Sequence, residues 1–264
     1  MGEGGIKSEQ LAVSGEQKKQ ISPKLLTAHC SLLTFPPGPP PTFSIIIPVY
    51  NEAGVLGETL AGLPETPDLE IIVVDGGSTD GTLEVVSRFP SVHLLQTTKG
   101  RGRQMNAGAR AARGEFFVFL HADTLLGTAH LAALRRAAAD PGLRAGAFEL
   151  LLTPPLPALR FIAWGANRRA HVLGLPYGDQ ALSLRRDLFE KLGGFSEQRP
   201  EDLDLVIRVR RYTRIRLLTP PVASSGRKWR QQGYFYTTVK NWLFFAYHLA
   251  ERTFTSIWGE KREL

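Results

Sequence analysis

Apolar and polar positions alternate in regular blocks from Phe43 onwards. Continuous apolar runs rich in β-branched residues are typical of buried strands, and apolar residues three or four positions apart are typical of a helix face. We therefore predict strands over Phe43–Val49, Glu70–Asp75, Val92–Gln96, Glu115–Leu120, Ala145–Leu152, Ala181–Arg185 and Arg214–Leu218. We predict helices over 55–63, from Ser78 or Thr79 to Arg88, and over Arg101–Arg113 (with Gly114 just past its end), Gly127–Ala139, Leu159–Leu173, Asp187–Leu192, Asp202–Tyr212 and Tyr234–Thr253. This order predicts an α/β fold with a mainly parallel sheet flanked by helices.

Three segments differ in composition. Residues 1–42 are polar and end in a proline-rich run, so we expect a poorly ordered leader. Residues 43–232 carry the strand and helix pattern and form the expected domain. Residues 233–264 are rich in aromatic side chains, and we expect a C-terminal helix that either packs on the domain or lies at a membrane interface.

The chain has 264 residues, a formal net charge of +7 and a single cysteine, Cys30. One cysteine excludes an intramolecular disulfide framework. The basic charge suits anionic partners, but no nucleic-acid-binding motif accompanies it. We find neither an apolar stretch of about 20 residues nor the apolar region of a secretory signal. We therefore expect a cytoplasmic protein, with peripheral contact at the inner membrane face as an alternative.

Polar clusters follow several of the predicted strands, at the point where each strand ends. The segments are PVYNE after the first strand, DGGSTDGT at the end of the second, and HADT after the fourth. In an open α/β sheet, ligands bind at the carboxyl ends of the strands. The pattern predicts a nucleotide at this sheet edge and a divalent metal held by Asp123.

These motifs occur in a definite order with further ones, namely N-x-G-x-x-x-A-x-G, GDQ followed by LGGF, and an acidic E-D pair. The order resembles family 2 glycosyltransferases with the GT-A fold, from about Phe43 to Arg211. Within that family, HADT and RGRQMNAGA resemble a small bacterial branch linked to arsenosugar or glycolipid synthesis. The resemblance implies an enzyme that transfers a sugar from a nucleotide-diphospho-sugar, with UDP as the expected nucleotide.

By the same resemblance, the donor site draws on the first, second and fourth strand ends and on the basic turn of Lys99, Arg101 and Arg103. The implied donor residues are Pro48, Val49, Tyr50, Glu52, Asp75, Gly76, Lys99, Arg103, His121 and Asp123. Each group also has a structural interpretation. Asp75 alone can form an Asx-turn, Glu52 can cap a helix, and the basic turn can simply be exposed.

The metal site departs from the family pattern at its first position. His121-Ala122-Asp123 stands where the family has D-x-D, so the implied direct ligand is Asp123 and the metal is Mn²⁺ or Mg²⁺. We interpret His121 as a contact for ribose or pyrophosphate that favours Mn²⁺.

The acceptor side is implied by the later motifs. Four residues are expected near the acceptor or the donor sugar, namely Asp179, Gln180, Glu201 and Trp229. The resemblance implies that Asp202 is the base that deprotonates an acceptor hydroxyl in an inverting transfer. The segment 227–230 does not match the Q-x-x-R-W motif of processive relatives, which predicts a non-processive enzyme acting on a lipid or a small molecule.

Two other functions remain open from the residues. A nucleotidyltransferase has a similar sheet and metal chemistry, but a Gly-rich basic loop after the first strand is missing here. A sugar-nucleotide-binding or membrane-scaffold protein without activity is the third hypothesis. The acidic set Asp75, Asp123, Asp179 and Asp202 argues against it.

Overall fold

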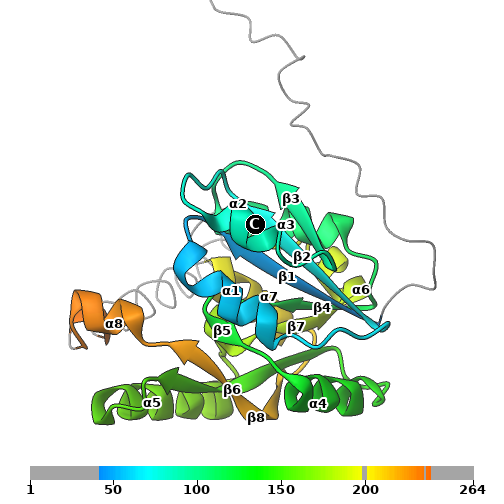
Figure 1. Cartoon of the computed structure of the whole chain (residues 1–264). Helices are drawn as coiled ribbons and strands as arrows, with labels where there is room; N and C mark the ends of the chain where they lie inside the picture. The colour runs from blue at the N-terminus through cyan, green and yellow to red at the C-terminus, as the bar shows by residue number, and fades with distance from the viewer. Residues whose placement is uncertain (1–41, 198–200, 235, 239–264) are drawn as a thin grey trace, which may run out of the picture.

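The computed structural model describes residues 42–197, 201–234 and 236–238 (Figure 1). The predicted leader up to residue 41, Cys30, and the aromatic segment from 239 onwards lie outside the described residues. Among the described helices, none is both long and apolar enough to cross a bilayer.

The centre of the fold is an eight-stranded sheet with the order β3-β2-β1-β4-β7-β6-β8-β5. The strands are β1 (Phe43–Val49), β2 (Leu69–Asp75), β3 (Val92–Gln96), β4 (Phe116–Phe119), β5 (Thr124–Leu125), β6 (Ala145–Thr153), β7 (Ser183–Arg185) and β8 (Arg216–Ser225). In the first half, β3, β2, β1 and β4 are parallel. The carboxyl ends of these strands therefore meet along one edge, as the sequence predicts.

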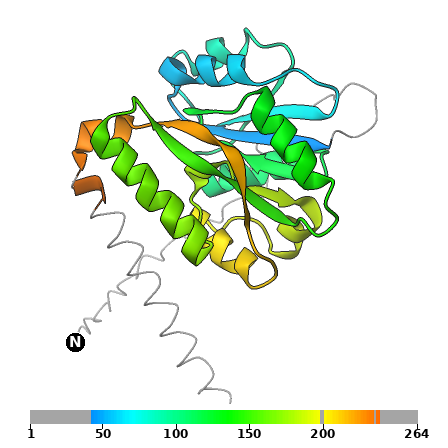
Figure 2. The same ribbon diagram turned by 90° about the horizontal axis from the view of Figure 1, so that it is seen from below.

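The helices follow the predicted order with small shifts at their ends. They are α1 (Ala53–Gly62), α2 (Thr82–Val86), α3 (Arg101–Ala111), α4 (Thr128–Ala138), α5 (Pro157–Leu173), the short 3₁₀ helix η2 (Gly178–Gln180), α6 (Arg186–Lys191), α7 (Glu201–Arg210) and α8 (Arg227–Gln232). Figures 1 and 2 show them around the curled sheet. The α/β fold class is thus confirmed.

The hydrophobic core has two faces because side chains alternate along each strand. On β1, Ile45 and Ile47 are buried in one cluster with Leu56 of α1. Ile46 points the other way, into a second cluster with Met105 of α3. The continuous apolar run of β1 is explained by burial on both sides of the sheet.

Several local predictions need correction. The second half of the sheet is mixed rather than parallel, because β7 runs antiparallel to both β4 and β6, and β5 runs antiparallel to β8. Helix α2 begins after Gly81, not at Ser78 or Thr79, since the Ser78 hydroxyl donates to Asp75 instead. Strand β8 continues to Ser225, well past the predicted end, and β5 and α8 were not predicted.

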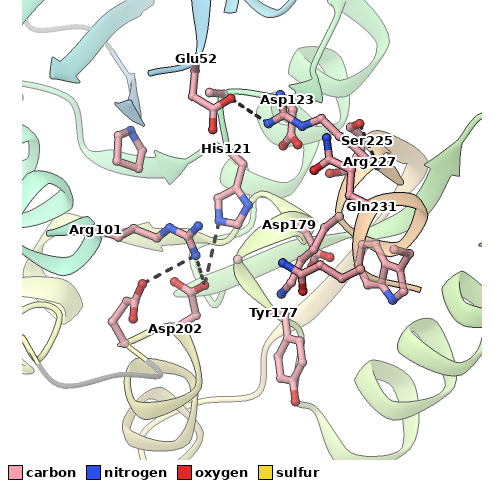
Figure 3. A pocket seen from close by; sticks show the side chains of 18 of the residues that line it. Glu52, Arg101, His121, Asp123, Tyr177, Asp179, Asp202, Ser225, Arg227 and Gln231 are labelled. Atoms are coloured by element: carbon pink, nitrogen blue, oxygen red, sulfur yellow. Dashed lines mark hydrogen bonds and ion pairs between the residues drawn. The ribbon is translucent and has the colours of Figure 1, made fainter. Parts of the chain in front are cut away.

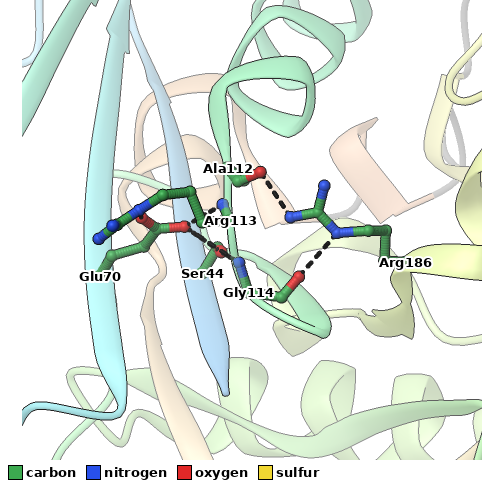
Figure 4. A network of polar contacts seen from close by, with 6 residues as sticks. All are labelled: Ser44, Glu70, Ala112, Arg113, Gly114 and Arg186. Carbon is green, nitrogen blue, oxygen red and sulfur yellow. Dashed lines mark hydrogen bonds and ion pairs between the residues drawn. The ribbon is translucent and has the colours of Figure 1, made fainter. Parts of the chain in front are cut away.

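A partly buried polar network joins β1, β2, the loop between α3 and β4, and α6, at the end of the sheet opposite the strand carboxyl ends (Figure 4). One carboxylate oxygen of Glu70 accepts hydrogen bonds from the Ser44 hydroxyl (2.5 Å) and from the amides of Arg113 (2.5 Å) and Gly114 (3.2 Å). The Arg186 guanidinium donates to the carbonyl of Gly114 at 2.9 Å. Gly114 is needed because a Cβ there would lie 2.5 Å from the Ser44 hydroxyl oxygen, and not because it ends the preceding helix.

We expect Glu70→Ala to lower the free energy of unfolding by about 3–5 kcal/mol, because two amides and the half-buried Arg113 side chain lose the acceptor that the buried Glu70 carboxylate provides. Urea denaturation at constant pH measures the change. Glu58→Ala on the exposed side of α1 is the control, with an expected change within about 0.5 kcal/mol. Equal stability of the two variants would contradict a structural role for the network.

Candidate functional site

A cavity of about 610 Å³ opens where the carboxyl ends of β1 and β4 meet η2, α7 and α8 (Figure 3). This volume is in the range of small-ligand pockets. Its lining residues are Pro48, Glu52, Arg101, His121, Ala122, Asp123, Tyr177, Gly178, Asp179, Glu201, Asp202, Leu203, Ser224, Ser225, Arg227, Lys228, Trp229, Gln231 and Gln232. The structure therefore brings together most of the acidic residues that the sequence singled out, with cations from both ends of the domain.

Asp202 lies in the first turn of α7, next to Glu201. Burial raises the pKa of its carboxyl to about 6, although the nearby Arg101 guanidinium opposes this, and the charges of Glu201 and Asp179 raise the pKa further. Arg101 lies 3.7 Å from Glu201 and 4.0 Å from Asp202. A carboxylate with this pKa is ionised at neutral pH and is a stronger base than an ordinary aspartate.

His121 comes two residues after the end of β4 and directly follows the buried Leu120. Burial lowers its pKa to about 3, and the positive charges of Arg101 and Lys228 act in the same direction. The ring is therefore neutral at pH 7, so its approach to Asp202, 4.0 Å from Nε2 to Oδ2, is not an ion pair at that pH. Among the described residues, Nε2 has no hydrogen-bond partner, which leaves it available to a ligand.

Asp123 is the acidic centre of the other side of the pocket. Its pKa is raised by burial and by the negative charges of Glu52 and Asp179, against the opposing charge of Arg227. A divalent cation would offset this concentration of negative charge, and carboxylate oxygens are suitable ligands. Within the described residues, no three acidic, histidine or cysteine side chains are grouped as ready metal ligands. Asp123 thus fits a metal whose remaining ligands come from the substrate or water.

An ion pair joins the two ends of the domain across the cavity. Arg227, the first residue of α8, donates to Glu52 at 2.8 Å (Figure 3). Glu52 belongs to the loop after β1, so the contact spans 175 positions of sequence. The ion pair places the Arg227 guanidinium beside Asp123, in a position to bind an anionic ligand in the cavity.

Gly178 lies directly against the Asp202 and His121 side chains. A Cβ at this position would lie 2.7 Å from Nε2 of His121 and even nearer to Oδ2 of Asp202. Its backbone also donates a hydrogen bond that lowers the pKa of Asp202. Only glycine leaves room for both side chains here.

Other predicted donor residues lie outside the cavity lining. The Asp75 carboxylate is fully buried and accepts the amides of Gly77 (2.9 Å) and Ser78 (3.0 Å), which is an Asx-turn. Gly76 lies against Gln104, and the Val49 carbonyl accepts from the Gln104 amide at 2.7 Å. The interaction of this segment with a nucleotide base stays a prediction.

The basic turn divides into two parts. Lys99 lies over the Tyr50 ring at 3.7 Å from its centroid, and Arg103 pairs with Glu197 at 2.8 Å on the surface. Only Arg101 of this turn faces the cavity. Gln180 is also outside it: its amide donates to the Phe148 carbonyl at 2.9 Å. Its expected contact with the sugar stays a prediction.

Sequence reasoning did not single out Tyr177, Ser225 or Gln231, which also line the cavity. Arg227 and Lys228 had been noted only as part of a motif comparison. The signal that could have identified them is their place just after β8, an element whose end was predicted seven residues too early. The extended β8 brings them back to the pocket.

Part of this chain matches a known protein family. Residues 44–145 match the family model Glycosyl transferase family 2. A relative is the PGL/p-HBAD biosynthesis glycosyltransferase of Mycobacterium bovis, 39% identical over 95 residues, which cover 33% of this chain and 37% of the relative. Poly-beta-1,6-N-acetyl-D-glucosamine synthase of Staphylococcus epidermidis is 31% identical over 90 residues, covering 31% and 22%. The chain thus spans well under half the length of these relatives.

Solved structures agree on the fold. S. aureus TarS (residues 1–349) has a TM-score of 0.57 at 20% identity, covering 70% of this chain and 60% of that one. The mannosyltransferase PcManGT from Pyrobaculum calidifontis, in complex with GDP-Man and Mn²⁺, has a TM-score of 0.54 at 28% identity, covering 71% and 57%. TarS is also known in complex with UDP-GlcNAc. These similarities confirm the predicted GT-A type of fold.

Proposed function

We propose that this chain, a member of glycosyl transferase family 2, transfers a sugar from a nucleotide-diphospho-sugar to an acceptor hydroxyl with inversion. One observation carries the proposal: Asp202, with a pKa raised to about 6, lines the same cavity as Asp123 and the cations Arg101 and Arg227. A base and an anion-binding wall are the two parts that such a transfer needs. The family match supports this activity, with UDP as the expected nucleotide.

The donor diphosphate is expected on the side of Asp123. Arg227 and Lys228 supply positive charge there from α8, and the Glu52 carboxylate holds Arg227 in place. Asp123 would hold Mn²⁺ or Mg²⁺, which supplies positive charge to the leaving diphosphate when bound. The buried position of Asp123 among other carboxylates supports this assignment.

Asp202 would act on the acceptor. As the acceptor oxygen forms its bond to the anomeric carbon, its proton passes to the Asp202 carboxylate, and the bond between that carbon and the diphosphate oxygen breaks. A single displacement of this kind inverts the anomeric centre. Arg101 keeps Asp202 ionised before the reaction, and neutral His121 offers a hydrogen-bonding nitrogen beside it.

The acceptor itself is a lipid or a small molecule. Trp229 lines the cavity and offers an aromatic face on which a sugar or another apolar surface can stack. Asp179 and Glu201 provide acceptors for hydroxyl groups on the same wall. The absence of the Q-x-x-R-W sequence in residues 227–230 supports transfer of one sugar per encounter.

Nucleotide binding tests the donor assignment. UDP, GDP, dTDP and CMP are each titrated with and without Mn²⁺ while thermal unfolding is followed. Binding to the folded state raises the midpoint, and at about 100 times Kd it adds about 2.7 kcal/mol. We expect selective, Mn²⁺-dependent stabilisation by UDP. If none of these stabilises the chain but nucleoside triphosphates, titrated in the same way, do, a nucleotidyltransferase is favoured. Nucleotide binding without any sugar transfer would favour a binding protein.

We expect Gly178→Ala to reduce kcat by about 10²-fold, because the added methyl group must displace Asp202 or His121 from their positions. Sugar transfer and thermal unfolding are measured together. Gly57→Ala is the control, since a methyl group there meets Val85 at an ordinary 3.6 Å. Full activity of the Gly178 variant would show that the exact position of Asp202 is unimportant.

A further inference from the structure

Helix α5 carries an unusual outer face. In Figure 1 it lies along the lower edge of the fold, and Figure 2 shows it on the outside of the molecule. Phe161 and Trp164 are 70% and 59% exposed, and their rings stack on each other with centroids 5.6 Å apart. Val172, further along the helix, is 67% exposed. Large apolar side chains grouped on one helix face mark a surface for interaction.

The charged side chains that α5 itself contributes are all basic, and among the described residues the one acidic side chain paired with the helix is Glu149 of β6, at His171. The sequence of α5, PALRFIAWGANRRAHVL, contains no acidic residue. Arg160 and Arg168 are exposed, and within the described part of the chain neither has an acidic partner. At the helical period, both fall on the same side as Phe161 and Trp164. The combination of exposed aromatic rings with arginines is complementary to an anionic, partly apolar surface.

The inner side of α5 is firmly attached to the domain. Leu159 and Ala163 are buried against β6 in a small core cluster. The Asn167 side chain accepts from the amide of Leu150 at 2.8 Å and donates to its carbonyl at 3.0 Å. The helix therefore presents its outer face without having to unfold or rotate.

The same cluster connects α5 to the candidate active site. Trp229, which lines the cavity, packs against the cluster beneath α5. At the C-terminal end of the helix, the Arg169 guanidinium lies 3.5 Å from the ring centroid of Tyr177, another lining residue. Any partner that binds the outer face of α5 would thus lie next to a helix that directly contacts the wall of the cavity.

We infer that the outer face of α5, formed by Arg160, Phe161, Trp164, Arg168 and Val172, docks the protein on the surface of an anionic lipid bilayer. The aromatic and aliphatic side chains enter the headgroup boundary, and the two arginines bind the acidic headgroups. Docking holds the cavity wall beside the membrane. The inference concerns the surface alone and does not depend on the proposed sugar transfer.

Vesicle sedimentation with the full chain tests this docking. The vesicles are made of phosphatidylcholine alone or of phosphatidylcholine with phosphatidylglycerol. We expect binding to the anionic vesicles, weakened by added salt, and little binding to the neutral ones. Arg160→Gln with Arg168→Gln should weaken binding at least about tenfold, at roughly fivefold for each charge. Phe161→Ser with Trp164→Ser should weaken it at least about tenfold as well.

Tyr212→Ser is the matched control, because Tyr212 is 53% exposed and its ring contacts Lys191 of α6, so it does not belong to the outer face of α5. It should bind like the unchanged protein. All substituted side chains are exposed, so unchanged thermal midpoints are expected and are measured in parallel.

The inference is overturned if the unchanged chain does not bind anionic vesicles. It is equally overturned if the Phe161/Trp164 variant binds them normally, which would assign the contact to residues 239–264 or another surface. Light scattering that shows a dimer lost in this variant, without vesicle binding, would assign the face to a second copy.

Discussion

Asp202→Asn is expected to reduce kcat by roughly 10²–10⁴-fold while leaving nucleotide binding intact. The amide has almost the same shape as the carboxylate but cannot take the acceptor's proton. Donor binding should persist because Asp202 lies on the Arg101 side of the cavity, whereas the donor is expected near Asp123. Sugar transfer is measured as the release of nucleoside diphosphate, and donor binding is measured by thermal shift.

Asp204→Asn provides the matched control on the same helix. Asp204 pairs with Arg208 at 2.7 Å, as the spacing of four residues predicts, and it does not line the cavity. Its loss should cost about 1–3 kcal/mol of stability, because the pair is largely buried, and should leave kcat unchanged. If both variants transfer sugar at the normal rate, Asp202 is not the base.

The pH profile gives an independent check of the same assignment. The base must be ionised, and burial raises the pKa of Asp202 to about 6. The carboxyl group keeps its proton below that pH, so kcat/KM, which reports the free enzyme, should fall about tenfold per pH unit below 6 and level off above it. The profile of Asp204→Asn should be the same. A rate that stays constant from pH 5 to 8 would contradict this role.

Asp123→Ala should abolish the Mn²⁺-dependent part of nucleotide binding and lower kcat by about 10²–10³-fold, because the metal loses its protein ligand. The variant should stay folded. The pKa of this half-buried carboxyl is raised by burial and by the negative charges of Glu52 and Asp179, so removing it relieves unfavourable interactions in the unliganded protein. Thermal shift with UDP, with and without Mn²⁺, measures both effects in one experiment.

Asp179→Asn separates metal ligation from the general negative charge of the pocket. Asp179 is a neighbouring buried carboxylate whose own pKa is raised by burial. The change should leave Mn²⁺-dependent binding of UDP in place. If the Asp179→Asn and Asp123→Ala variants both lose Mn²⁺-dependent UDP binding to the same extent, the metal is held by the acidic cluster rather than by Asp123 alone. If neither loses it, the metal lies elsewhere.

The apolar pattern predicted the strands of the first half of the fold within one or two residues. The run Phe43–Val49 is one example, because burial on both faces requires an unbroken apolar stretch. The second half was less predictable. The predicted strand Arg214–Leu218 stops before Thr219-Pro220-Pro221, where proline argues against a strand, yet β8 passes through these residues to Ser225.

By itself, then, the sequence determined the α/β order, the resemblance to family 2 glycosyltransferases, and the residue types at the strand ends, since these depend on local periodicity and on the order of motifs. Only the tertiary structure decided which of these residues share a cavity. Asp75 and Asp123 both follow apolar strands, but Asp75 is enclosed by its own turn whereas Asp123 lines the pocket. The pairing of Arg227 with Glu52 and the raised pKa of Asp202 were likewise invisible in the sequence. Burial and charge proximity arise from contacts between distant segments, and no local pattern encodes them.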